Sequence, residues 1–256
     1  MRFPTMFSAA VFMVALLAGA GAQAQTAPRA YAVMSLAGNT LALHAKREQV
    51  GTRTESAPIQ VLALEDQILD EAAILAARAV LLKALPGAQP VLMMTQDKGL
   101  YGAQNAMFDQ PDAHQADRDY LKSMLAAQGV SHLVLVSKFR GNAELKLVNS
   151  TEGGGVLEGM GFFVDDTIAT INLNTQDGSR GMVVPFVYVR VRLLDARTLQ
   201  VVREATAKRT RILARPSVEP SGMESFAAMT AVEKVKQLSV LLQVAMDETL
   251  PRVLAQ

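Results

Sequence analysis

Residue types that often act in catalysis are present in this chain, but their spacing matches no familiar catalytic arrangement. The three histidines, His44, His114 and His132, lie in different expected elements, and no two of them have the spacing of metal ligands. The chain has no cysteine and none of the motifs His-Glu-x-x-His, Gly-x-Ser-x-Gly and Ser-x-x-Lys. His132 lies in an apolar stretch, which favours a core or sheet-edge histidine over a catalytic base. We therefore expect a protein that is not an enzyme, with a hydrolase of dispersed site as an alternative.

Patterns typical of metal and nucleotide sites are incomplete. Asp165 and Asp166, taken with Asp177, lack the alternating oxygen ligands of a calcium loop, which favours ordinary acidic turns. The glycines at 153–155 are not followed by Gly-Lys-Ser or Gly-Lys-Thr, so they do not form a phosphate-binding loop. The sequence predicts neither a cofactor nor a metal.

An arginine-rich stretch, residues 185–212, is the first candidate binding surface. Residues 187–193 alternate between apolar side chains and those of Tyr188, Arg190 and Arg192. This period of two predicts a half-buried strand with a basic face towards water, and a second strand from Val201 completes a hairpin. The basic face either guards a sheet edge or binds an acidic partner such as anionic lipid or polymer. On the second interpretation the partner-binding side chains are Arg190, Arg192, Arg209 and Arg211.

A glycine-rich apolar stretch, inserted at residues 150–166, is the second candidate. Glycine permits bulges, so the stretch is either a β-excursion whose apolar side chains fold back on the core or an exposed loop that docks on a membrane or on another subunit. Both interpretations stay open at the level of sequence. The docking side chains on the second one are Val156, Leu157, Met160, Phe162 and Phe163.

The start of the chain has the pattern of a secretory signal peptide. Arg2 precedes an apolar run, and alanines flank a cleavage point after Ala24. The run is shorter than the roughly 20 residues that a spanning helix needs. We expect residues 1–24 to be removed, residues 25–30 to form a flexible lead, and the mature protein to be periplasmic. Because cysteine is absent, no lipid anchor on cysteine and no disulfide is expected.

Composition narrows the class of protein further. Removal of residues 1–24 leaves 232 residues with 24 basic and 24 acidic side chains. A nucleic-acid binder normally carries a basic excess, so nucleic acid is not an expected partner. Tryptophan is absent and aromatic residues make up 5% of the chain, which leaves few platforms for carbohydrate stacking. We expect residues 31–256 to form a single domain with a core of Ala, Val, Leu and Met.

The order of the expected elements predicts an α+β fold with a mixed sheet. A hairpin at residues 31–44 turns at Gly38-Asn39. A helix over 64–85, with Ile68 and Leu75 on its core stripe, leads to a buried strand near 90–95. The next expected elements are a loop over 97–111, a helix over 112–128, a buried strand over 130–137, the closing hairpin and a C-terminal helix that a capping box starts at Thr230.

This order of elements resembles an envelope superfamily that includes the curli secretion channel protein, the lipoprotein activators of penicillin-binding proteins and the amino-terminal domain of TolB. The resemblance covers residues 58–211 and rests on two stretches. The first is Gly129-Val-Ser-His-Leu-Val-Leu-Val, and the second is the turn Asp195-Ala-Arg-Thr-Leu-Gln-Val-Val, in which Leu199 stands where the family has glycine. The resemblance implies a non-enzymatic, partner-binding envelope protein.

Two functional hypotheses follow from these observations. The leading one is a soluble periplasmic protein that binds a protein partner of the cell envelope. The alternative is an oligomeric or membrane-associated assembly or secretion accessory that docks through residues 153–164, with peripheral membrane contact and homo-oligomer formation.

Overall fold

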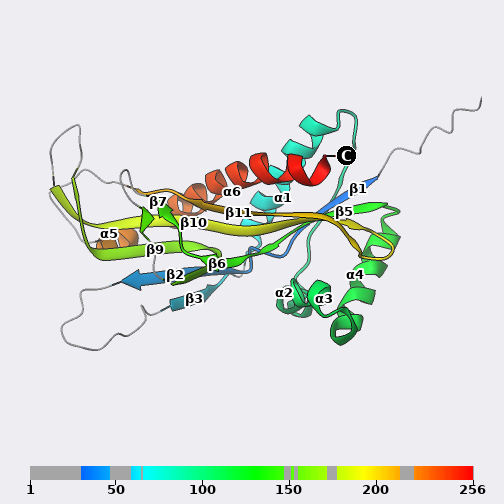
Figure 1. Cartoon of the computed structure of the whole chain (residues 1–256), viewed down its shortest axis with the longest axis horizontal. Helices are drawn as coiled ribbons and strands as arrows, with labels where there is room; N and C mark the ends of the chain where they lie inside the picture. The colour runs from blue at the N-terminus through cyan, green and yellow to red at the C-terminus, as the bar shows by residue number, and fades with distance from the viewer. Residues whose placement is uncertain are drawn as a thin grey trace, which may run out of the picture.

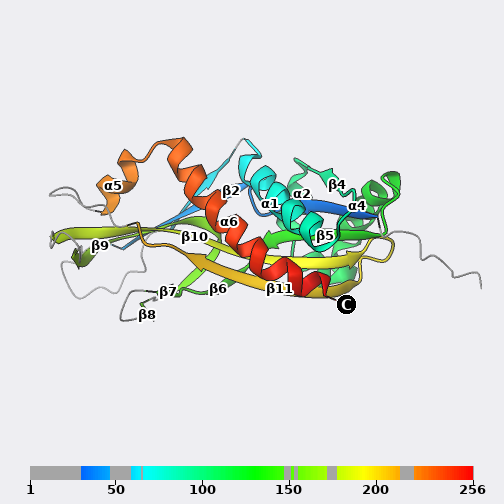
Figure 2. The same ribbon diagram turned by 90° about the horizontal axis from the view of Figure 1, so that it is seen from above.

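The structure is a computed structural model that describes residues 30–46, 59–64, 66–146, 151–152, 155–171, 178–213 and 222–255. It confirms an α+β fold: helices cover both faces of a curled mixed sheet (Figures 1 and 2). The strands are β1 (Tyr31–Ser35), β2 (Thr40–Lys46), β3 (Ile59–Ala63), β4 (Val91–Met93), β5 (His132–Lys138), β6 (Arg140–Asn142), β7 (Leu145–Lys146), β8 (Thr151–Glu152), β9 (Val156–Ile171), β10 (Gly178–Asp195) and β11 (Val201–Thr210).

The helices divide between the two faces of the sheet. They are α1 (Ile68–Ala84), α2 (Lys98–Ala103), α3 (Ala106–Asp109), η1 (Pro111–His114), α4 (Gln115–Ala127), α5 (Gly222–Ala228) and α6 (Ala231–Leu254). One face packs against α1, α5 and α6 in the larger core cluster. The segment from α2 to α4 packs against the opposite face in a second cluster.

Strand β10 organises the sheet because it is longer than its neighbours. It has 18 residues, and β11 pairs with one of its edges. Its other edge is shared: β5 pairs with Val189 to Asp195, and β9 pairs with residues 178–188. The chain leaves this edge at Phe139, whose N–H donates to the Tyr188 carbonyl. Two strands therefore follow one another along a single edge of β10.

Strands β1 and β2 repeat this arrangement one position further out. Strand β1 lies parallel to β5 and to β4, whereas β2 lies parallel to β9 and antiparallel to β3. The chain thus runs straight on from β1 to β2, and the hairpin expected at residues 31–44 is wrong. Gly38 does not mark a hairpin turn. A Cβ at Gly38 would lie 2.4 Å from the backbone nitrogen of Asp70, so this position requires glycine because the chain passes close to α1.

The helix expected at 64–85 is α1, but its core stripe was placed on the wrong side. Ile68 and Leu75 are 45% and 47% exposed, whereas Leu69, Ala73 and Leu81 are buried. The helix is apolar on most of its circumference, so the period of the pattern does not select one face. The strand β4 is likewise an edge strand with Leu92 exposed, and the loop expected at 97–111 contains α2 and α3.

Several signals for the ends of elements are confirmed. Gly129 has a φ of 63° and follows α4, and Thr230 forms a complete capping box with Glu233 at the start of α6. In the β10–β11 turn, the Asp195 carboxylate accepts hydrogen bonds from the backbone and hydroxyl of Thr198. Leu199 has a φ of 56°, in the region that glycine adopts most easily, while its side chain is buried.

The position of β9 between β2 and β10 in the sheet gives the first testable prediction. A Cβ on Gly161 would lie 1.9 Å from the Ala42 carbonyl oxygen and 2.8 Å from the Phe186 ring. Because backbone atoms of a central strand cannot give way, Gly161→Ala should lower the free energy of unfolding by roughly 3 kcal/mol or more in urea titrations. Gly102→Ala, which meets nothing within 4 Å, is the matched control and should leave stability unchanged or slightly higher. Equal midpoints for the two variants would contradict this packing.

Candidate functional site

The place where β5 gives way to β9 is filled by a polar network, which we call the seam. The Lys138 ammonium donates to Asn39 Oδ1 at 2.7 Å and to Thr40 Oγ1 at 2.6 Å. The Lys138 backbone lies beyond the end of β1, and side chains replace the missing strand: its N–H donates to Gln104 Oε1 at 2.7 Å, and its carbonyl accepts from Asn105 Nδ2 at 2.8 Å. The seam therefore fixes the positions of β5, the β1–β2 junction and the α2–α3 segment relative to one another.

A buried carboxylate completes the seam from α1. Asp70 is 1% exposed and accepts hydrogen bonds from Ser35 Oγ at 2.5 Å, the Gly38 N–H at 2.8 Å and the Tyr101 hydroxyl at 2.7 Å. Burial, followed by the hydrogen bond to Asp70 and its negative charge, raises the pKa of Tyr101 far above its ordinary value. Burial also lowers the pKa of Lys138. Because each of these groups has a hydrogen-bond partner, we interpret the seam as a network that stabilises the fold.

Arg192 is buried, which corrects the expected basic face of β10. Its side chain is 1% exposed and donates to Glu204 at 3.1 Å and to Asn105 Oδ1 at 2.9 Å, while the Phe108 ring covers the guanidinium at 4.7 Å. Tyr188 is fully buried, and Arg190 lies over Phe139. The segment from α2 to α3 and β6 cover this face of the sheet, so β10 is buried on both sides over residues 182–194, apart from the half-buried Arg190.

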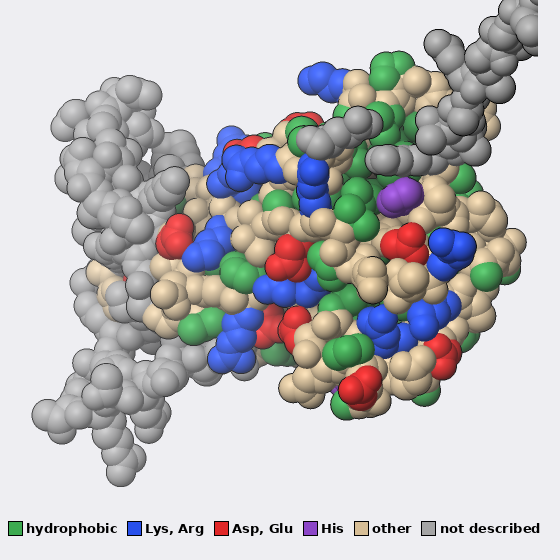
Figure 3. All heavy atoms as spheres, turned by 45° about the vertical axis from the view of Figure 1, so that its right-hand side comes forward, with side chains coloured by type: hydrophobic (Ala, Val, Ile, Leu, Met, Phe, Trp, Pro, Cys, Tyr) green, Lys and Arg blue, Asp and Glu red, His purple; other side chains and the backbone are tan. Residues whose placement is uncertain are grey.

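The other predicted arginines lie at the outer edge of the sheet. Arg211 is exposed just beyond β11, and Arg209 is half-buried. The structure therefore separates the four predicted residues into two places: Arg190 and Arg192 inside, and Arg209 and Arg211 at the edge. Acidic and basic side chains are interspersed on the side that carries α4 and the β10–β11 turn (Figure 3).

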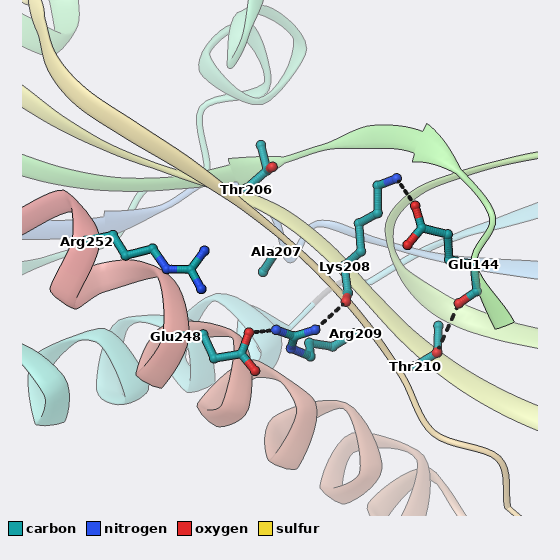
Figure 4. Close-up of a pocket in the computed structure, with 8 residues that line it drawn as sticks. All are labelled: Glu144, Thr206, Ala207, Lys208, Arg209, Thr210, Glu248 and Arg252. Atoms are coloured by element: carbon teal, nitrogen blue, oxygen red, sulfur yellow. Dashed lines mark hydrogen bonds and ion pairs between the residues drawn. The ribbon is translucent and has the colours of Figure 1, made fainter. Parts of the chain in front are cut away.

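A pocket lies along the outer edge of β11, and we call it the edge pocket. Its volume is about 310 Å³, and it opens between β11, the C-terminal part of α6 and Glu144 (Figure 4). Lys208 pairs with Glu144 at 2.6 Å, and Arg209 pairs with Glu248 of α6. Arg252 enters from α6 without an ion-pair partner among the residues that the structure describes. The lining residues are Glu144, Thr206, Ala207, Lys208, Arg209, Thr210, Glu248 and Arg252.

The sequence indicated only part of this pocket. Arg209 was expected to bind a partner, but Thr206, Glu248 and Arg252 were not singled out because α6 reaches β11 only in the folded chain. The spacing of Glu248 and Arg252, one helical turn apart, was the available signal that both share a face of α6.

Most of the glycine-rich stretch is part of strand β9, which agrees with the β-excursion that packs on the core and not with the docking loop. Leu157, Met160 and Phe162 are at most 1% exposed, and Phe163 is half-buried, so these side chains form the core. Val156 is 38% exposed at the start of the strand. The glycines allow close approach, as at Gly161, and a φ of 69° at Gly159 beside Lys138. Residues 153–154 lie outside the described residues.

Across the described ranges, no group of three or more His, Cys, Asp or Glu side chains is placed to hold a metal ion. The same residues include no helix that is long and apolar enough to cross a membrane. His132 stacks near Tyr31 with ring centroids 5.5 Å apart, and His44 is buried beside Phe186. Asp165 is buried and accepts hydrogen bonds from the backbone and hydroxyl of Thr167.

Comparison with known proteins identifies no family for this chain. No family model matches the chain, and no curated protein matches it. Among solved structures, lipoprotein GNA1162 from Neisseria meningitidis is similar with a TM-score of 0.28 and 12% identity, over 82% of this chain and 99% of that one.

The pKa of Tyr101 generates a prediction about alkaline stability. Tyrosine in the unfolded chain ionises near its ordinary pKa of 10.0, whereas folded Tyr101 stays neutral above it. The stabilisation from this group is therefore fully present below pH 10 and is lost as pH rises beyond it. Tyr101→Phe should cost about 1–2 kcal/mol at pH 7, because Asp70 loses a donor. Above pH 10, urea titrations should show a smaller difference in the free energy of unfolding between Tyr101→Phe and the wild type. A difference that does not change with pH would contradict this role of Tyr101.

Arg192 generates a second prediction at this site. Arg192→Lys cannot reach Glu204, Asn105 and Ser137 together, because lysine lacks the planar fork of donors. We expect a loss of about 2–3 kcal/mol in the free energy of unfolding. Arg211→Lys, at an exposed position, is the matched control and should change stability by less than about 0.5 kcal/mol. If both variants unfold at the wild-type midpoint, the buried arginine does not stabilise the fold.

Proposed function

We propose that this protein is a non-enzymatic periplasmic protein that binds a protein partner of the cell envelope. The signal-peptide pattern of residues 1–24 supports the compartment. The observation that carries the proposal is the edge pocket. There, cationic side chains lie beside an edge of β11 that pairs with no strand among the described residues.

The electrostatic balance of this surface favours an acidic partner. From Val201 to Arg211 the chain carries four cations, Arg203, Lys208, Arg209 and Arg211, against one acid, Glu204. Arg252 adds a further guanidinium from α6. Because such charges lie at a rim, they steer and orient a partner more than they add affinity. The apolar side chains of β9 are used in the core, so the proposal does not depend on them.

Charge reversal at the edge tests this proposal. The double variant Arg211→Glu/Arg252→Glu should reduce capture of the partner from envelope extract by roughly tenfold, and capture by the wild type should weaken as salt is raised. Lys98→Glu/Lys236→Glu makes the same change in net charge at exposed positions away from the pocket and is the matched control.

Two outcomes would contradict the proposal. One is that the Arg211→Glu/Arg252→Glu variant captures as much of the partner as the wild type does. The other is turnover of an ester, peptide or glycan substrate by the purified protein that a single point substitution abolishes, since this would show an active site instead.

A further inference from the structure

The outer edge of β11 presents backbone groups that no described strand occupies. Among the described residues, β11 pairs with β10 alone, and the Arg211 N–H donates to the Pro185 carbonyl across that ladder. In an antiparallel pair, residues alternate between those that bond to the partner and those that face away. Arg203, Ala205, Ala207 and Arg209 therefore bond to β10. The N–H and C=O groups that face the outer edge are those of Glu204, Thr206, Lys208 and Thr210. At this edge Glu144 accepts hydrogen bonds from the Lys208 ammonium at 2.6 Å and from the Thr210 hydroxyl at 3.3 Å.

A side-chain contact supports this alternation and shows how the edge is covered. The Arg209 guanidinium donates to the carbonyl oxygen of Lys208 at 2.9 Å while it pairs with Glu248. The Lys208 carbonyl therefore points outward, and one outward acceptor is already satisfied by a cation. Such a cover guards an edge strand against random pairing. The N–H groups of Thr206, Lys208 and Thr210 have no backbone partner within the described part of the chain.

We infer that β11 is a site for strand addition, and that an extended acidic segment of the partner pairs with Thr206–Thr210. This inference rests on the proposed function and specifies how the partner binds. Strand addition supplies main-chain hydrogen bonds, and side chains at alternate positions supply specificity. The segment displaces Arg209 from the Lys208 carbonyl and places a carboxylate beside Arg252.

Charge selects the occupant of this edge. A second copy of the chain would bring its own Arg203, Lys208 and Arg209 against the same residues, and like charges that face each other across strands are destabilising. A partner strand with glutamate or aspartate at alternate positions matches the cations instead. The acids that line the pocket, Glu144 and Glu248, already pair with Lys208 and Arg209, so Arg252 is the cation left for a carboxylate.

Thr206→Pro isolates the backbone contribution. Proline removes the N–H of Thr206, which faces outward, and leaves the ladder to β10 intact, since proline is tolerated where the N–H side of an edge strand faces solvent. Thr206→Ala keeps that N–H and is the matched control. The probe is a labelled ten-residue peptide of alternating glutamate and valine, with a glutamine–valine peptide for comparison, and binding is measured by fluorescence anisotropy.

Thr206→Pro should bind the glutamate–valine peptide about tenfold more weakly than Thr206→Ala, because the two variants share the loss of the threonine side chain and differ in the N–H. Each protein should bind the glutamine–valine peptide about tenfold more weakly than the glutamate–valine peptide. Peptide binding by Thr206→Pro that equals Thr206→Ala overturns strand addition. If Arg211→Glu/Arg252→Glu still loses the peptide in that case, the acidic partner docks by charge alone and the proposed function stands.

Hydrogen exchange keeps the test decisive if Thr206→Pro fails to fold. In the wild-type protein, the amides of Thr206, Lys208 and Thr210 should become protected when the peptide is added. Those of Ala205, Ala207 and Arg209 should be protected already. Absence of added protection, or absence of any peptide binding, overturns strand addition, whereas the effect of charge reversal on partner capture decides the proposed function separately.

Discussion

The length of β10 is the constraint on which the rest of the structure depends. Eighteen residues of one strand are more than β5 alone can cover, so β5 and β9 share an edge, and β1 and β2 share the next position outward. A gap in hydrogen bonding opens wherever two strands meet end to end. The seam around Lys138 and Asp70 closes that gap with side chains from α1, α2 and α3. Polar groups therefore lie deep in this protein because strand ends lie there.

The two edges of the sheet are protected in different ways. Strand β11 carries cations and covers one of its own carbonyls with Arg209. The opposite edge consists of β3 and β4, which are short and carry solvent-exposed Val61, Leu62 and Leu92. Short length limits pairing on that side, whereas charge limits it at β11. Only the second kind of protection can be reversed by a partner of opposite charge.

Local signals in the sequence predicted much of the element order, and long-range contacts explain what they missed. Gly129, Thr230 and the alternation of residues 187–193 each act within a few residues, so the helix end, the capping box and the hairpin were predictable. The direction from β1 to β2 depends on Asp70 meeting Gly38, which no local pattern encodes. Arg192 was expected in water for the same reason, since Asn105 and Phe108 reach it from a distant part of the chain. Of the edge pocket, the cations of β11 were predicted, whereas the packing of α6 beside them is a long-range contact.

The straight run from β1 into β2 also affects the order in which the chain can fold. Tyr31 pairs with His132, about a hundred residues later, and β2 pairs with β9, which is further still along the chain. Contacts at such sequence separation form slowly because a long loop must be closed first. Strands β3 and β4 lie nearer along the chain, so β2 and β1 can gain an outer neighbour early, whereas their central neighbours β9 and β5 come later. The centre of the sheet therefore forms only after β10, in the last third of the chain, has been made.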